Sequence, residues 1–331
     1  MANITILGGG FGCALAVLLN GMGHHITLWS ALPEEIEAIR RDGEQKAKLP
    51  GVKIPKEIEL TNDIGAVSGC DMLLVVIPSA FVRQTLRLAA PHLTPGTIVC
   101  NAGKGIEDGT LKLMSTVFAE ELPQARLVII TGPCHAEEVA RGIPTSVVVA
   151  SRDEDAASMV QSWMSSPIFR VYLNDDVIGC ELGGALKNVI ALSAGISDGL
   201  GYGDNTKAAL MTRGLHEIAR LGVAVGAKQE TFSGLAGLGD LIVTCTSMHS
   251  RNRRAGILIG QGVSPTDAVA QVGTVEGYYC CHTAYHVAKK YAVEMPITEV
   301  LYSVLYENAD VTTAVVRLMG RPEHHEHEKI G

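Results

Sequence analysis

The feature that most constrains the fold is an alternation, up to about residue 175, of short apolar runs with helix-like patterns. The runs are rich in β-branched residues and nearly continuous in their hydrophobicity, which is typical of strands that helices cover on both faces. Strands separated by helical spacers of roughly 10–15 residues predict βαβ units and a mostly parallel, doubly wound sheet. The expected strands span residues 4–7, 25–29, 72–77, 97–100, 127–131, 146–150 and 169–172.

After about Val177 the hydrophobic pattern changes to the 3.6-residue period of helices. Glycine-rich breaks at 198–203 and 234–239 interrupt this part, and Pro296 falls where a helix is expected to begin. We therefore predict an α/β domain with a Rossmann-like sheet over residues 1–176, followed by an all-α domain over 177–331. The expected helices span 182–196, 207–221, 251–260, 276–291, 297–305 and 311–318.

Composition excludes several classes of protein. Lys plus Arg total 27 against 35 Asp plus Glu, and a net charge of -8 opposes general binding to nucleic acid. The sequence contains no run of ~18 uncharged apolar residues, so we expect no stable membrane insertion. The N-terminus lacks the basic region of a secretory signal. Eight scattered cysteines, without metal-like spacing, favour reduced thiols and a cytoplasmic protein without a metal. The histidine-rich tail at 323–328 could chelate a metal weakly or could simply be solvated.

A glycine-rich turn follows the first expected strand. The segment Gly8-Gly9-Gly10-Phe11-Gly12 leads into a helix expected from Cys13, which is the context that a dinucleotide pyrophosphate requires. Its spacing is one residue shorter than G-x-G-x-x-G, and a turn that only connects strand to helix is the alternative. Residues 29–33 offer neither an acidic residue nor an arginine for the ribose, and Glu34 and Glu35 are assigned to the next helix. The sequence therefore leaves NAD and NADP equally open.

Two further groups of residues could carry chemistry. Lys187 and Asn188 lie in an apolar helix, where burial would lower a lysine's pKa and suit it to proton transfer; a structural lysine that reaches solvent is the alternative. The run 250–254 places arginines at a helix start, which favours binding of a small phosphate, although it could also be a solvated basic surface. The loop 132–137 could add N–H groups near a nicotinamide.

Several blocks of this sequence resemble the bacterial NAD(P)-dependent glycerol-3-phosphate dehydrogenases along nearly the whole chain. The most specific blocks are 183–191, 195–201, 235–241, 244–246 and 250–254, supported by 104–107, 132–133, 136–138, 275–278 and 294–299. The resemblance implies reversible hydride transfer between NAD(P)H and dihydroxyacetone phosphate, giving sn-glycerol 3-phosphate for phospholipid synthesis. It also implies a homodimer formed through the helical domain.

The resemblance assigns roles residue by residue. Lys187 matches the proton-transfer lysine. Substrate-side positions are Lys104, Gly132, Cys134, Asn188, Asp240, Thr244, Ser250, Arg251 and Asn252, of which Ser250, Arg251 and Asn252 match the phosphate clamp. Cofactor positions are Gly8, Gly10, Phe11, Gly12, Lys104, Ala136, Arg251 and Glu276.

The departures from the family pattern lie at the cofactor end. The glycine loop is one residue short and must be rerouted, Ala31 stands where Arg or His is usual, and Cys134 replaces Ser or Thr. Two other functions stay open on the same scaffold. One is a sister dehydrogenase acting on another 2-hydroxy or 3-hydroxy acid. The other is a non-catalytic sensor of a dinucleotide or metabolite.

Overall fold

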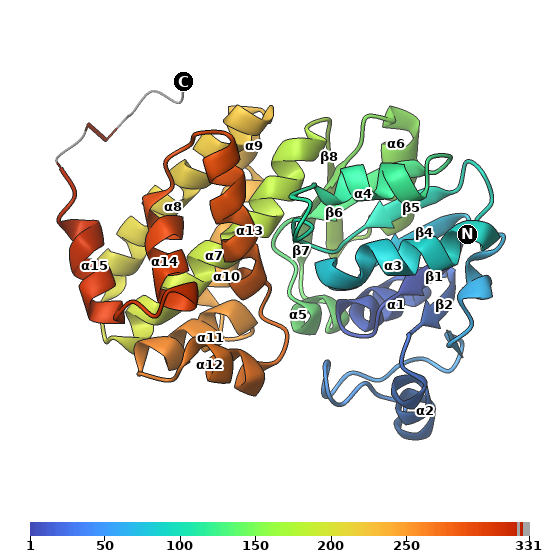
Figure 1. Ribbon diagram of the computed structural model, residues 1–331. Coiled ribbons are helices and arrows are strands. Elements are labelled where there is room, and N and C mark those ends of the chain that lie inside the picture. The colour runs from blue at the N-terminus through green and yellow to red at the C-terminus, as the bar shows by residue number, and fades with distance from the viewer. Residues whose placement is uncertain (323–324, 327–331) are drawn as a thin grey trace. The chain divides into compact units, whose positions relative to one another are not determined.

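The computed structural model describes residues 1–322, 325 and 326, in two compact units (Figure 1). The first unit comprises Met1–Lys104 and Met114–Val177, and the second comprises Gly105–Leu113 and the chain from Ile178. The predicted boundary lies within a residue of the observed one, but Gly105–Leu113 joins the second unit because Ile106 is buried in the helical core. Most of the histidine-rich tail, namely Glu323, His324, His327 and Glu328, lies outside the described residues.

The first unit is built on one eight-stranded sheet of order β3-β2-β1-β4-β5-β6-β7-β8. All neighbouring strands run parallel except β6 and β7, which confirms the predicted mostly parallel sheet. The edge strand β3 was not predicted, because it has only three residues and two of them are polar. The strands are β1 (Asn3–Leu7), β2 (His25–Trp29), β3 (Glu59–Thr61), β4 (Met72–Val75), β5 (Ile98–Asn101), β6 (Arg126–Thr131), β7 (Thr145–Ala150) and β8 (Phe169–Asn174).

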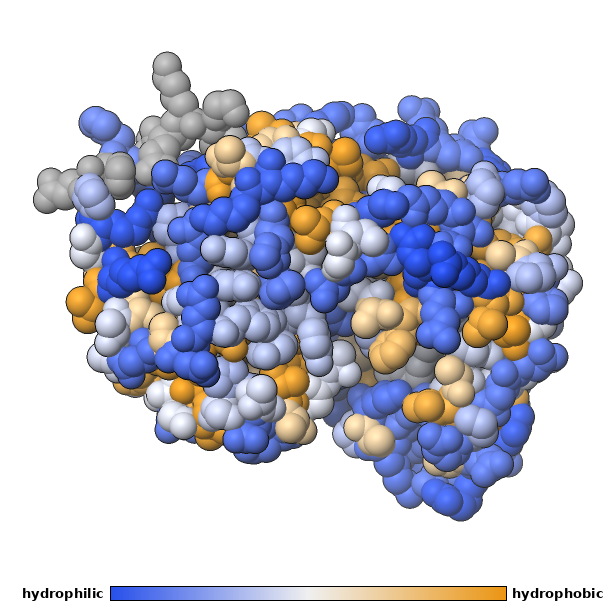
Figure 2. Space-filling view, in the orientation of Figure 1, coloured by the Kyte–Doolittle hydropathy of each residue, from blue (hydrophilic) through white to orange (hydrophobic). Residues whose placement is uncertain are grey.

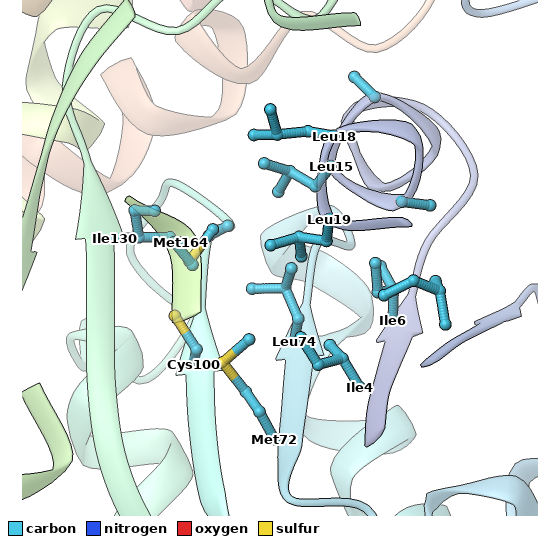
Figure 3. Packing of buried hydrophobic residues seen from close by; sticks show 14 of the residues in the cluster. Ile4, Ile6, Leu15, Leu18, Leu19, Met72, Leu74, Cys100, Ile130 and Met164 are labelled. Carbon is cyan, nitrogen blue, oxygen red and sulfur yellow. The ribbon is translucent and has the colours of Figure 1, made fainter. Parts of the chain in front are cut away.

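Helices cover both faces of this sheet, as the apolar strands require. Ile4 and Ile6 of β1 face the core that Leu15 and Leu19 of α1 complete (Figure 3), whereas Leu7 faces the opposite core with α3 and α4. The helices of this unit are α1 (Phe11–Gly21), α2 (Pro33–Asp42), α3 (Ser79–Ala89), α4 (Met114–Glu121), α5 (Ala136–Ala140) and α6 (Glu154–Met164), with the short 3-10 turns η1 (Ile64–Val67) and η2 (Ala90–His92).

The second unit is helical, as predicted. Its helices are α7 (Val177–Gly199), α8 (Asp204–Val225), α9 (Gln229–Phe232), α10 (Asp240–Thr246), α11 (Arg251–Gly260), α12 (Pro265–Val272), α13 (Glu276–Lys290), α14 (Pro296–Tyr306) and α15 (Val311–Met319), and a π-helical turn, η3 (Leu235–Gly239), precedes α10. By length and composition α7 could cross a membrane, but 83% of its most apolar stretch is buried, so it serves here as a core helix. On the face drawn in Figure 2, apolar residues gather in small groups among hydrophilic ones.

Candidate active site

The glycine loop connects β1 to α1 with only three residues, Gly8, Gly9 and Gly10. The helix begins at Phe11, two residues before the predicted start at Cys13, because the Gly10 carbonyl already accepts the Cys13 N–H at 3.1 Å. Gly8 has φ +127°, and a Cβ there would lie 2.2 Å from the Val76 carbonyl oxygen. The shortened loop therefore keeps the tight turn after β1 and the helix N-terminus of a dinucleotide-binding loop. Its position between β1 and β4 is the point where the strand order reverses.

The Cys13 thiol holds this loop in place. Its Sγ donates to the Gly9 carbonyl oxygen at 2.7 Å, one turn before it in the chain. Burial, reinforced by the nearby Glu35 carboxylate, raises the pKa of Cys13 to about 12. The side chain therefore stays a protonated donor at neutral pH, in spite of its place at a helix N-terminus.

A buried carboxylate, Glu35, lies against the same loop, although the sequence predicts for it only a place in the next helix. Glu35 is in the first turn of α2, as predicted, but its side chain is only 6% exposed. It accepts hydrogen bonds from Ser30 Oγ at 2.5 Å, from Lys48 Nζ at 2.6 Å and from Gln45 Nε2. A Cβ on Gly9 would lie 2.2 Å from Glu35 Oε1. The only signal in the sequence was its position 23 residues after Gly12, close to the spacing of the acidic residue in Rossmann-type units.

Four other predicted residues of the first unit follow β5 and β6 in the chain, and three of them are in contact. Lys104 Nζ donates to the Gly132 carbonyl oxygen at 3.3 Å, and Cys134 Sγ donates to the same oxygen at 3.1 Å. Ala136 is the first residue of the short helix α5. The structure thus brings Lys104 and Gly132, both predicted as substrate-side positions, into direct contact.

In the second unit, Lys187 lies in the middle of α7 and its side chain is 7% exposed. Its Nζ forms an ion pair with Asp240 Oδ1, whose side chain is fully buried, and donates to Thr244 Oγ1 at 2.8 Å. Thr244 in turn donates to the Asp240 carbonyl oxygen at 2.6 Å. The alternative of a lysine that reaches solvent is therefore wrong. Asp240 can meet the ammonium because the π-helical turn η3 leads directly into α10, and such turns are frequent at functional sites.

Asn188 and Asn252 form a second polar link. Asn252 Nδ2 donates to Asn188 Oδ1 at 2.9 Å, and Asn252 Oδ1 accepts the Gly277 N–H at 2.7 Å. These bonds join α7, α11 and the first turn of α13, where Glu276 is the first residue. Both asparagine side chains are buried, so in this structure their amides serve to connect helices.

The basic run at the start of α11 divides into two parts. Ser250 is the N-cap residue and accepts the Arg253 N–H at 3.2 Å, while the Arg251 side chain is exposed at the first turn. Arg253 points elsewhere: its Nε donates to Asp198 Oδ2 at 2.7 Å, and Asp198 Oδ1 also pairs with Lys207 Nζ at 2.7 Å. The helix N-terminus with Ser250 and Arg251 can bind a phosphate. Arg253 instead ties α11 to Asp198 of α7, which Lys207 of α8 also pairs.

Glycines set the distance between α7 and α11. A Cβ on Gly195 would lie 2.1 Å from the Arg253 carbonyl oxygen, and one on Gly256 would lie 2.1 Å from the Leu192 carbonyl oxygen. The two backbones are therefore in direct contact, and no side chain fits between them. This contact places Asn252 beside Asn188 of α7, with which it shares a hydrogen bond.

Known protein families and individual relatives match this chain over both of its units. The family model described as NAD-dependent glycerol-3-phosphate dehydrogenase N-terminus matches residues 3–157, and the model of its C-terminus matches residues 176–316. The chain is 52% identical over 329 residues to glycerol-3-phosphate dehydrogenase [NAD(P)+] of Moorella thermoacetica, covering 98% of both chains. It is 48% identical over 332 residues to that of Desulfitobacterium hafniense, covering 100% of this chain and 94% of the relative.

A solved structure gives the same result. The crystal structure of glycerol-3-phosphate dehydrogenase from Coxiella burnetii superimposes with a TM-score of 0.93 at 38% identity, covering 97% of this chain and 99% of that chain. Both the sequence and the fold therefore agree over both units, and the chain belongs to the NAD-dependent glycerol-3-phosphate dehydrogenase family.

Proposed function

We propose that the protein catalyses reversible reduction of dihydroxyacetone phosphate to sn-glycerol 3-phosphate, with NADH or NADPH as the second substrate and Lys187 as the proton-transfer residue. The observation that carries the proposal is the buried ammonium of Lys187, which Asp240 and Thr244 hold in place. The relatives are named as glycerol-3-phosphate dehydrogenases, and their similarity over the full chain supports the same substrate for this protein.

The reduced dinucleotide supplies a hydride to the carbonyl carbon of the substrate when it is bound. A C–H bond forms at that carbon while the carbon–oxygen double bond becomes single, and the oxygen gains negative charge. Lys187 Nζ gives this oxygen a proton and becomes a neutral amine, and in the oxidising direction the amine takes the proton back. Asp240 and Thr244 fix Nζ, so that little reorganisation is needed at the moment of transfer.

The phosphate group would bind at the start of α11. Ser250 and Arg251 combine a hydroxyl, a guanidinium and the N–H groups of the first helical turn, which together suit a dianion. A clamp on the phosphate orients the distant carbonyl carbon, so its binding energy also serves the chemical step.

The Rossmann-like unit fits the dinucleotide. The Gly8–Gly10 loop keeps the tight strand-to-helix turn and the helix N-terminus of a phosphate-binding loop despite its shortened sequence. This observation weakens the alternative of a sensor with a decayed cofactor loop. A sister dehydrogenase acting on a hydroxy acid would not need a phosphate-binding site at the start of α11.

The test is the initial rate of NADH oxidation, and separately of NADPH oxidation, with dihydroxyacetone phosphate. We expect Lys187→Ala to lose roughly 100- to 10,000-fold in kcat, whereas Lys290→Ala, an exposed lysine of α13, keeps the wild-type rate. Absence of turnover in a folded protein that binds dinucleotide would favour the sensor. Turnover of 2-hydroxy or 3-hydroxy acids instead would favour the sister dehydrogenase.

We further propose that the protein acts in the cytoplasm as a homodimer joined through the helical unit and supplies glycerol phosphate for phospholipid synthesis. Eight free cysteines suit a reducing compartment. Light scattering on the purified protein tests the dimer, for which a mass of one 35.0 kDa chain would be the contrary result.

A further inference from the structure

The carboxylate of Glu35 occupies an unusual position for a residue in the first turn of a surface helix. Its neighbour Glu34 is exposed, but Glu35 turns back under the start of α2 and is buried. The loop after α2 returns Gln45 and Lys48 to the same point, where both donate to Glu35 Oε1. Ser30, at the end of β2, donates to Oε2.

This carboxylate adjoins the cofactor loop. Leu7 and Trp29 are register partners at the ends of β1 and β2, so the residues that follow them, Gly8 and Ser30, leave the sheet side by side. Glu35 lies directly against Gly9, where the position of a Cβ would be 2.2 Å from Oε1 and 2.5 Å from Oε2. In a Rossmann-type unit, the ribose next to the pyrophosphate binds between these two strand ends.

We propose that Glu35 selects NAD over NADP by accepting a hydrogen bond from the ribose 2′-hydroxyl. A carboxylate has about four acceptor positions, and Ser30, Gln45 and Lys48 use three of them. A hydroxyl can donate to the remaining position. A 2′-phosphate carries about -1.5 to -2 charges near neutral pH and would face a buried carboxylate.

Lys48 is the group that could reverse this preference. Its ammonium is 2.6 Å from Glu35 and its side chain is 44% exposed. The ammonium of Lys48 forms an ion pair with this carboxylate. Without that carboxylate, the same ammonium would be an attractive partner for a 2′-phosphate. The two residues should therefore shift the nucleotide preference in opposite directions.

The experiment is titration calorimetry of NADH and of NADPH into the full-length protein without the ketone substrate. The two nucleotides differ only at the 2′ position, so the ratio of their dissociation constants isolates this site. We expect NADH to bind at least about tenfold more tightly, a difference of about 1.4 kcal/mol. Glu35→Gln should shift the ratio at least about tenfold toward NADPH, and Lys48→Ala should shift it further toward NADH.

Glu34→Gln is the matched control, because it removes an exposed carboxylate from the same helical turn and should leave the ratio unchanged. A wild-type ratio of one or below would overturn the proposal, as would an unchanged ratio in folded Glu35→Gln. If Glu35→Gln fails to fold, competition on wild-type protein decides. Adenosine 5′-monophosphate should displace NADH at least about tenfold better than adenosine 2′,5′-bisphosphate, and equal displacement would refute the role of Glu35.

The inference rests on the cofactor site at the Gly8–Gly10 loop. Failure of both nucleotides to bind would overturn that site and the role of Glu35 together. Equal binding of the two nucleotides would overturn the role of Glu35 alone.

Discussion

Asp240→Asn should destabilise the protein strongly, although it hardly changes the volume of the side chain. Asp240 is fully buried and its partner Lys187 is 7% exposed, so the substitution leaves a buried ammonium without its carboxylate. Removing one partner of a buried ion pair costs about 3–5 kcal/mol. For a unit of this size, with about 2–4 °C per kcal/mol, the midpoint of thermal unfolding should fall by roughly 6–20 °C.

A double-mutant cycle separates the lost pair from other effects of the substitution. Lys187→Met alone leaves a buried carboxylate, whereas Lys187→Met with Asp240→Asn leaves no charge at this place. The double variant should therefore be more stable than the sum of the single changes predicts, by about 1–3 kcal/mol. Urea unfolding followed by far-UV circular dichroism gives the four free energies of unfolding.

The control is Asp204→Asn, which changes the exposed first residue of α8 and should stay within about 0.5 kcal/mol of wild type. A loss below about 1 kcal/mol in Asp240→Asn, or additive effects in the double variant, would refute the buried ion pair. Activity cannot replace the stability measurement, because each variant of the pair is expected to be inactive.

Three further outcomes follow from the same structure. Gly256→Ala should lower the free energy of unfolding in urea by about 1–3 kcal/mol, because the new methyl group meets the backbone of α7. The control Gly21→Ala, at a helical position with open space around it, should not destabilise the protein. Equal effects of the two changes would contradict the close contact. Burial raises the pKa of Glu217 from 4.5 to about 7, so the native state binds this proton more tightly and the free energy of unfolding should decrease as pH rises from about 4.5 to 7. Urea unfolding across that range should show a smaller decrease for Glu217→Gln, and an identical slope would exclude Glu217 as its source. Arg251→Ala should lower kcat as well as raise KM for dihydroxyacetone phosphate; a change in KM alone would mean that the arginine binds the ground state and transition state equally.

The fold was largely predictable because its strands are continuous apolar runs and its helices keep a clear period. The exceptions have physical reasons. The strand Glu59–Thr61 is held by pairing with β2 rather than by hydrophobicity of its own. The segment Gly105–Leu113 joins the helical unit because Ile106 packs in that core, a long-range contact that no local pattern encodes.

The candidate site was predictable where a residue type contradicts its surroundings. Lys187 in an apolar helix indicated a buried charge, and the structure supplies the carboxylate that such a charge requires. Glu35 gave no such signal, since an acidic residue in the first turn of a helix is ordinary. Its burial depends on Gln45 and Lys48 returning from the next loop, which only the folded chain brings about.

The polar groups of α7 join this helix to three of its neighbours. Lys187 is paired from α10, Asn188 is bonded from α11, and Asp198 is shared by α8 and α11. Each of these bonds comes from a different part of the chain, so the helices cannot move apart without exposing a buried charge or an unpaired amide. The glycine contacts between α7 and α11 exclude the opposite movement, because the backbones already touch at Gly195 and Gly256. The distance between the start of α11 and Lys187 is therefore fixed from both sides, as the proposed proton transfer to a substrate held by its phosphate would require.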